Sequence, residues 1–245
     1  MKTIRLLILS ILLLSMPLSC SKQVKQEEAY NPERYLSRAD ELINNKEYEE
    51  ARKLLFELKN RDQTRNYAPL AQLKIADSYI RDGDYDAGIE EFRKFIEQYP
   101  DSQYASQAQY QIAMAYFNQI EAPDKGAGAA QKALEEFQKL KVLYPRNPYR
   151  EVIDIRIEKS KNTIADYEFI VGHFYFKKDS FRAALGRFEG LLKRFPDYKR
   201  ADETLYLIGL SYKGLKELDK ARDAFKELIQ RFPNSPFTEK AKKEL

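Results

Sequence analysis

Apolar positions between residues 32 and 240 recur three and four residues apart, as at Leu205, Ile208 and Tyr212, which is the period of a helix and not of a strand. A second pattern overlies this period: a small residue, a large apolar residue four positions on, and a proline eight positions after that. It occurs at Gly88, Phe92 and Pro100; at Ala133, Phe137 and Pro145; at Ala184, Phe188 and Pro196; and at Ala221, Phe225 and Pro233. Ala51 and Leu55 form a weaker copy without the proline. A pattern that returns every 37 to 51 residues indicates a repeat array.

Each repeat is expected to contain two antiparallel helices. A further small residue and a tyrosine precede the pattern, as Ala76 and Tyr79 precede Gly88, and the turn signal Asp82-Gly83-Asp84 separates the two halves. Two helices approach closely only where a side chain is reduced to alanine or glycine, so the small residues predict helix–helix contacts. Proline cannot continue a helix, so each proline predicts the end of a second helix.

This spacing resembles the tetratricopeptide repeat (TPR) over roughly residues 32–240. The resemblance implies an all-α fold, a right-handed superhelix of about five helix pairs, because one pair cannot bury its apolar face alone. A plain helical bundle is the alternative, although a bundle does not require a fixed spacing of small, aromatic and proline residues. The expected repeats cover 32–65, 69–102, 105–146, 148–198 and 201–235, within a TPR domain of residues 32–245.

The repeats are unequal in length. The steps between their small residues are 37, 45, 51 and 37. The first excess lies at residues 121–128 and predicts a lengthened turn between the two helices of unit three. The second comes from an unbroken helical period over residues 148–177, which predicts a first helix of unit four roughly 45 Å long at 1.5 Å per residue.

The beginning of the chain is expected to be a targeting segment. Lys2 and Arg5 precede an apolar run, and residues 1–19 therefore read as a secretory signal peptide that is too short to span a membrane. Cys20 is the only cysteine and cannot form an internal disulfide. Its position resembles a bacterial lipoprotein box, which implies N-palmitoyl and S-diacylglycerol groups on Cys20; a free thiol or an intermolecular bridge is the alternative. Residues 20–31 are then a lipidated N-terminus and flexible tether.

Composition gives little support to catalysis or nucleic-acid binding. The 42 Lys and Arg residues nearly balance the 38 Asp and Glu residues, and the charges are interleaved along helices, so no nucleic-acid partner is expected. His173 is the only histidine and is expected to be a packing or surface residue. Without a second histidine or cysteine, no zinc-type site, cofactor or enzymatic activity is predicted. Gly186 and Gly190 are expected to allow close helix packing.

The long helix, the lengthened turn and the sequence from 160 to 200 resemble the BamD family of outer membrane lipoproteins, which belongs to the β-barrel assembly machinery. That resemblance implies a non-enzymatic adaptor anchored by lipid at the periplasmic face of the cell outer membrane. Its implied partners are the POTRA domains of a BamA-like barrel protein, unfolded outer membrane proteins, the membrane lipid through Cys20, and other lipoproteins of the complex.

The resemblance also places candidate binding residues. Arg187, Glu189 and Arg194 are expected to face the BamA-like partner, with Arg187 pointing outwards to a carboxylate of that partner. A solvated surface arginine is the alternative. We further expect exposed tyrosines of the N-terminal repeats, Tyr35, Tyr67 and Tyr104, to hold an aromatic-rich segment of a barrel precursor.

Other functions remain open at this point. A TolA-associated envelope or cell-division protein shares such repeats but normally begins with a coiled coil. A pilus or polysaccharide-secretion lipoprotein does not need the thirty-residue helix.

Overall fold

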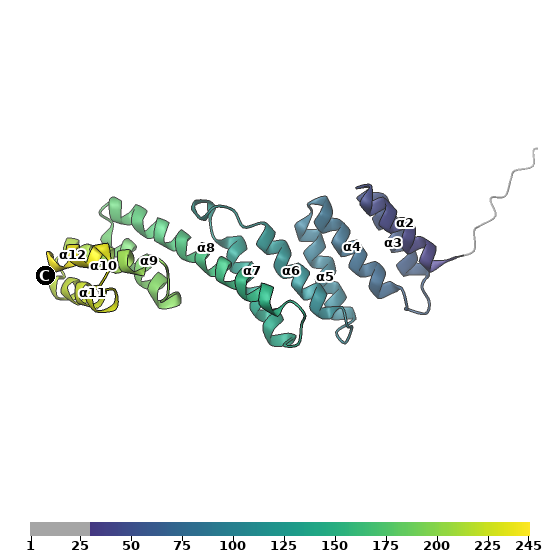
Figure 1. The fold of residues 1–245 in the computed structure, drawn as a ribbon. Coiled ribbons are helices and arrows are strands. Elements are labelled where there is room, and N and C mark those ends of the chain that lie inside the picture. Colours follow the sequence, from purple (N-terminus) through teal and green to yellow (C-terminus); the bar gives the residue numbers. More distant parts are fainter. Residues whose placement is uncertain (1–29) are drawn as a thin grey trace, which may run out of the picture. The chain divides into compact units, whose positions relative to one another are not determined.

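The computed structural model describes residues 30–245, so the predicted signal peptide and Cys20 lie outside the described residues. One compact unit spans Pro32–Leu245, and every regular element in it is a helix (Figure 1). The elements are α2 (Pro32–Asn44), α3 (Tyr48–Arg61), α4 (Ala68–Asp82), α5 (Tyr85–Gln98), α6 (Ala105–Asn118), a 3₁₀ turn η1 (Pro123–Lys125), α7 (Gly128–Leu143), α8 (Arg150–Lys177), α9 (Phe181–Arg194), α10 (Ala201–Gly214), α11 (Leu218–Arg231) and α12 (Pro236–Lys242).

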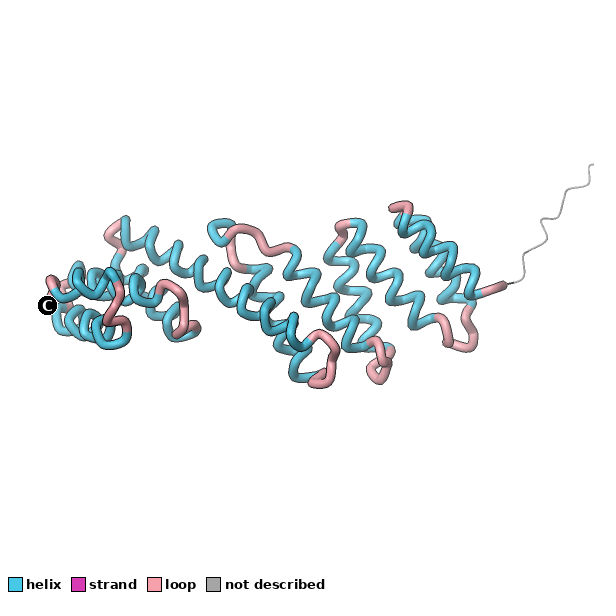
Figure 2. Tube along the Cα trace, viewed as in Figure 1, coloured by secondary structure: helices cyan, strands magenta, loops and turns pink. Residues whose placement is uncertain are grey.

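These helices form five consecutive pairs, from α2 with α3 to α10 with α11, and each helix also packs on the next along the chain. The short α12 closes the last pair. Figure 2 shows the loops that join them. The all-α TPR fold predicted from the repeat spacing is therefore confirmed.

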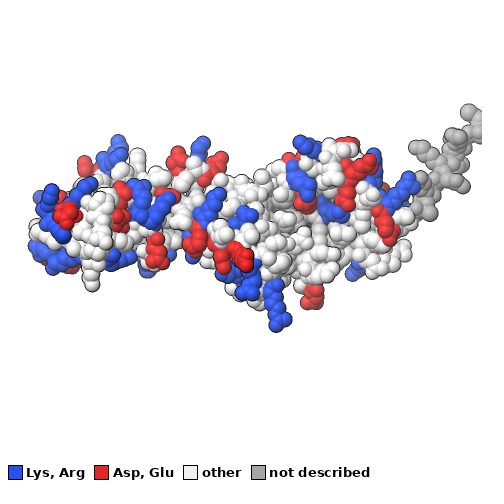
Figure 3. Space-filling view, in the orientation of Figure 1, with Lys and Arg blue, Asp and Glu red and all other residues white. Residues whose placement is uncertain are grey.

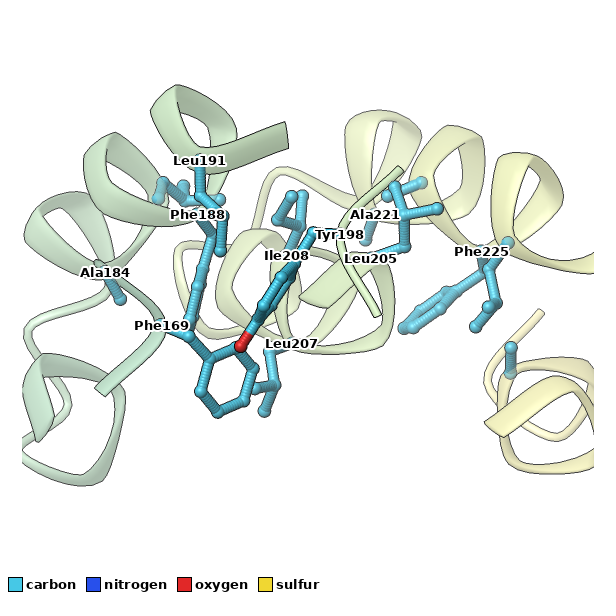
Figure 4. Packing of buried hydrophobic residues seen from close by; sticks show 14 of the residues in the cluster. Phe169, Ala184, Phe188, Leu191, Tyr198, Leu205, Leu207, Ile208, Ala221 and Phe225 are labelled. Atoms are coloured by element: carbon cyan, nitrogen blue, oxygen red, sulfur yellow. The ribbon is translucent and has the colours of Figure 1, made fainter. Parts of the chain in front are cut away.

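The repeat landmarks form the core. The alanines at 51, 133 and 184 are fully buried, and so are Phe137 and Phe188. A Cβ placed on Gly172 would lie 2.6 Å from the Phe188 ring, and one on Gly209 would lie 2.3 Å from the Phe225 ring. These distances are too short for a real Cβ, so glycine is what lets each phenylalanine pack on the backbone of the preceding helix. Figure 4 shows Phe188 packed beside Phe169 and Tyr198 in the C-terminal cluster.

The predicted long helix is α8, with 28 residues and a length of about 42 Å. Its N-terminal half packs on α7, where Ile153 and Ile157 share a cluster with Phe137. Its C-terminal half packs on α9, where Phe169 meets Phe188 at a ring-centroid distance of 5.8 Å. One helix therefore joins two hydrophobic clusters.

The lengthened turn in unit three covers the middle of α8. Residues 119–127 connect α6 with α7 and contain η1, which contacts α8. Ala127 and Ala130 form a small cluster with Ile164 of α8, and Ile120 packs against it. The lengthened turn of unit three and the long helix α8 therefore belong together in the structure, because the turn covers one side of that helix.

Candidate partner-binding surfaces

A buried carboxylate organises the surface of unit four. Glu168 lies on α8 and is only 8% exposed. Arg187 Nη1 of α9 donates to Glu168 Oε2 at 3.1 Å, and Arg194 Nη2, two turns further along α9, donates to Glu168 Oε1 at 2.8 Å. Hydrogen bonding to Glu168 raises the pKa of Arg187. One carboxylate therefore holds two guanidinium groups in fixed positions.

The two arginines remain partly available to a partner. Their side chains are 42% and 46% exposed, for Arg187 and Arg194 respectively. That Arg187 reaches outwards to a partner's carboxylate stays a prediction, and the structure adds that Glu168 of its own chain already accepts a hydrogen bond from it. The cause is that α8 and α9 pack side by side and bring residues 19 positions apart into contact.

A groove lies beside Glu168 and its two arginines, and small residues of α9 form its floor. We term it the α9 groove. It is lined by Glu168, Tyr175, Ala183, Gly186, Arg187, Gly190 and Arg194. A Cβ added at Gly186 or Gly190 would meet nothing within 4 Å. The prediction that these two glycines serve close packing inside the chain is therefore wrong. They face open space, although each costs about 1 kcal/mol of helix stability relative to alanine. Such a floor leaves the backbone of α9 open to close approach by another molecule.

Glu189 differs from Arg187 and Arg194, the other two residues that were expected to face the partner. It lies on α9 but accepts a hydrogen bond from the Tyr212 hydroxyl of α10, and this bond raises the pKa of Tyr212 to about 12. Glu189 therefore does not line the α9 groove and instead borders the next repeat.

The three tyrosines of the N-terminal repeats do not form one surface. Tyr35 is half-buried, and its hydroxyl donates to Glu57 Oε1 at 2.6 Å and accepts from Arg61 Nη1 at 2.9 Å. Tyr67 is also half-buried, and its hydroxyl donates to Glu33 of α2. The expectation of exposed side chains is wrong for these two, because each reaches a carboxylate on a neighbouring helix.

Tyr104 differs, since 37% of its surface is exposed. It lies just before α6 and lines a groove between α4 and α6, which we term the Tyr104 groove. Leu70 and Leu73 supply apolar surface there, and Asp77 and Arg81 supply charge. This combination suits an extended peptide that carries apolar side chains between polar backbone groups.

Sequence reasoning missed Glu168, although a signal for it is present. Gln72, Gln109 and Glu168 each stand four residues before a small landmark residue. The first two donate from Nε2 to the side chains of Glu91 and Glu136 on the paired helix. In unit four the carboxylate lies on the first helix and arginine on the second. The buried carboxylate of unit three, Glu136, lies on the second helix instead and pairs with Arg93 of the preceding repeat.

His173 stacks on Phe169 at a ring-centroid distance of 5.9 Å, as expected of a packing residue. Among residues 30–245, no three His, Cys, Asp or Glu side chains are grouped closely enough to hold a metal ion. Nor is any helix in that range both long and apolar enough to cross a membrane.

The helix pairs thus define a TPR scaffold. Residues 27–224 match the family model YfiO, described as an outer membrane lipoprotein, and the chain belongs to this family. It is 26% identical over 232 residues to the outer membrane protein assembly factor BamD of Neisseria gonorrhoeae, covering 89% of this chain and 86% of the relative. With the BamD of Vibrio cholerae it shares 24% identity over 233 residues, covering 91% and 96% of the two chains. Among solved structures, the TPR2AB domain of yeast Sti1 in its pHSP90 complex matches with a TM-score of 0.48 and 15% identity, covering 83% of this chain and 78% of that one.

Proposed function

We propose that this chain is an assembly factor for outer membrane proteins, a non-enzymatic adaptor that binds a BamA-like barrel subunit and unfolded barrel precursors. Membership of an outer membrane lipoprotein family and the name of its relatives support the general role. In this proposal Cys20 carries the lipid and holds the adaptor at the periplasmic face of the membrane, where further lipoproteins of the complex can join it.

The α9 groove is the proposed binding site for a POTRA domain of the barrel subunit. The main support for this site is the pair of half-exposed arginines bound to one buried carboxylate. Glu168 fixes Arg187 and Arg194, so a partner's acidic group would meet cations that are already oriented. Gly186 and Gly190 leave room for the partner's backbone beside them. Oriented charge beside an open floor is a favourable arrangement for specific protein binding.

Binding measurements with single substitutions test this site. Arg187→Ala is expected to weaken binding of a POTRA-containing fragment by about 10- to 100-fold, as for a central interface arginine. The fold is expected to persist because Arg194 still pairs with Glu168. Gly186→Leu is expected to weaken the same binding by filling the groove.

Arg182→Ala is the matched control, because Arg182 is exposed on α9, does not line the α9 groove, and its loss changes the charge equally. If Arg187→Ala and Arg182→Ala bind the fragment with the same affinity as the unchanged chain, the proposed POTRA site is wrong.

We place the unfolded barrel precursor in the Tyr104 groove. A photo-crosslinking residue at position 104 is expected to capture a C-terminal peptide of a barrel protein, because Leu70 and Leu73 beside it offer apolar contacts. Positions 35 and 67, whose hydroxyls are bonded within the chain, are expected to crosslink less. A yield at position 104 no higher than at Lys226 of α11 would contradict this placement.

A further inference from the structure

The turn between α7 and α8 differs from the corresponding turns of the other repeats. The two residues before the helix-ending aromatic are polar elsewhere: Glu97 and Gln98, Lys193 and Arg194, Gln230 and Arg231. In unit three they are Val142 and Leu143, which are 77% and 55% exposed. The residue after the proline is Asp101, Asp197 or Asn234 elsewhere and Arg146 here. Unit three alone thus ends in an apolar and basic turn.

The start of α8 adds to this surface. Val152 is 42% exposed and Ile155 is 72% exposed, both within the first two turns of the helix. Lys141 Nζ lies 2.6 Å from Asp154 Oδ1, which places the last turn of α7 beside the first turns of α8. We refer to residues 139–156 as the α7–α8 tip. The α7–α8 tip therefore exposes four large aliphatic side chains.

The charge of the tip is strongly positive. Residues 139–156 contain five Lys or Arg residues and two acids. Arg146 and Arg150 form no ion pair with another residue that the structure describes, and both are exposed. Figure 3 shows blue Lys and Arg atoms at the end of this hairpin, at the lower edge of the view. Exposed aliphatic side chains surrounded by unpaired cations are typical of a segment that lies in the headgroup region of a membrane.

We propose that the α7–α8 tip docks on an anionic phospholipid surface. Leu143 and its aliphatic neighbours enter the interface, and Arg146 and Arg150 bind lipid phosphates. Protein interfaces are enriched in aromatic residues and depleted of lysine at their centres, whereas the exposed apolar side chains of this tip are all aliphatic. The proposal rests on the membrane attachment proposed above. A second contact beside a lipid anchor holds a surface to the membrane far more firmly than either contact alone.

A fluorescent probe tests the contact in the full chain. An environment-sensitive fluorophore is placed on Leu143→Cys, the protein is reconstituted into vesicles, and its emission is read after flotation. The unsubstituted chain reports any labelling of Cys20. The probe is expected to shift to the blue in vesicles that contain phosphatidylglycerol and to stay unshifted in pure phosphatidylcholine. Gln98→Cys and Gln230→Cys, at the corresponding positions of units two and five, are the matched controls and are expected to stay unshifted in both.

Charge reversal tests the cations. The double variant Arg146→Glu with Arg150→Glu is expected to lower the ratio of membrane-inserted probe to water-exposed probe by at least roughly 30-fold. Each basic residue near an anionic surface strengthens binding to that surface by about fivefold. Added salt is expected to act in the same direction. Both arginines are exposed, so an unchanged circular dichroism spectrum is expected.

The outcomes separate the two proposals. A chain that does not float with any vesicle overturns membrane attachment and this docking with it. A chain that floats but whose probe at 143 behaves like those at 98 and 230 overturns only the docking. A probe at 143 that is shielded only after a POTRA-containing protein is added means that the tip is a protein interface, which also overturns the proposal.

Discussion

At the scale of single residues, the same amino acid has opposite roles at different positions of this chain. Gly172 and Gly209 lie against phenylalanine rings, so they are required by packing. Gly186 and Gly190 face open space, so packing within the chain does not require them. The difference comes from the direction in which each absent Cβ would point, and it has consequences for stability.

Alanine substitution separates these two roles. Gly172→Ala is expected to lower the free energy of unfolding by about 1–3 kcal/mol, because the added carbon would overlap Phe188, which is fully buried and cannot move aside. Gly186→Ala is its matched control and is expected to raise stability by about 0.5–1 kcal/mol through helix propensity alone. Urea unfolding of both variants measures the difference, and equal midpoints would contradict the packing described for Gly172.

His173 gives a second prediction at this scale. Burial lowers the pKa of its imidazole below the ordinary value of 6.5, and the charge of Lys177 lowers it further. The unfolded chain then binds the proton more readily, so the contribution of His173 to stability is lost as pH falls from about 6.5 through the folded pKa. NMR titration is unambiguous because the chain has one histidine. A measured pKa of 6.5 or above would contradict this burial, and His173→Gln is expected to remove this part of the pH dependence.

At the scale of elements, α8 is the feature that distinguishes this array from a regular one. Its N-terminal half belongs to the cluster around Phe137 and its C-terminal half to the cluster around Phe188. Its middle is covered by the loop between α6 and α7. Because adjacent repeats of such arrays are stabilised mainly by their neighbours, a continuous helix across this junction couples the N-terminal three units to the C-terminal two.

A proline in the middle of α8 tests that coupling. Asn162 is exposed, and Asn162→Pro removes one backbone hydrogen bond and costs about 3 kcal/mol or more at that point. Calorimetry is expected to show two unfolding transitions in place of one, because each half keeps its own cluster. Asn162→Ala is the control and is expected to unfold in one transition. A single transition at lower Tm for the proline variant would mean that the two halves are coupled through other contacts.

At the scale of the whole molecule, the proposed function depends more on departures from the repeat than on the repeat itself. Two of the three proposed binding surfaces lie where one unit differs from the others: two arginines on Glu168 in unit four, and an apolar, basic turn at the end of unit three. The overall charge is nearly balanced, so attraction to a partner depends on these local groups. In the proposed function, their separation along the chain lets one adaptor engage several partners at once.

Local features of the sequence specify the repeat units, the ends of their helices, the lengthened turn and the long helix. Helical period, a small residue at fixed spacing and a proline are local signals, and the chain obeys them locally. The packing of the helices was needed to show that Arg187 pairs with Glu168, that Tyr35 and Tyr67 use their hydroxyls within the chain, and that Gly186 faces open space. Each of those outcomes depends on which faces of two helices meet, and residues 19 to 34 positions apart carry no local signal of that meeting.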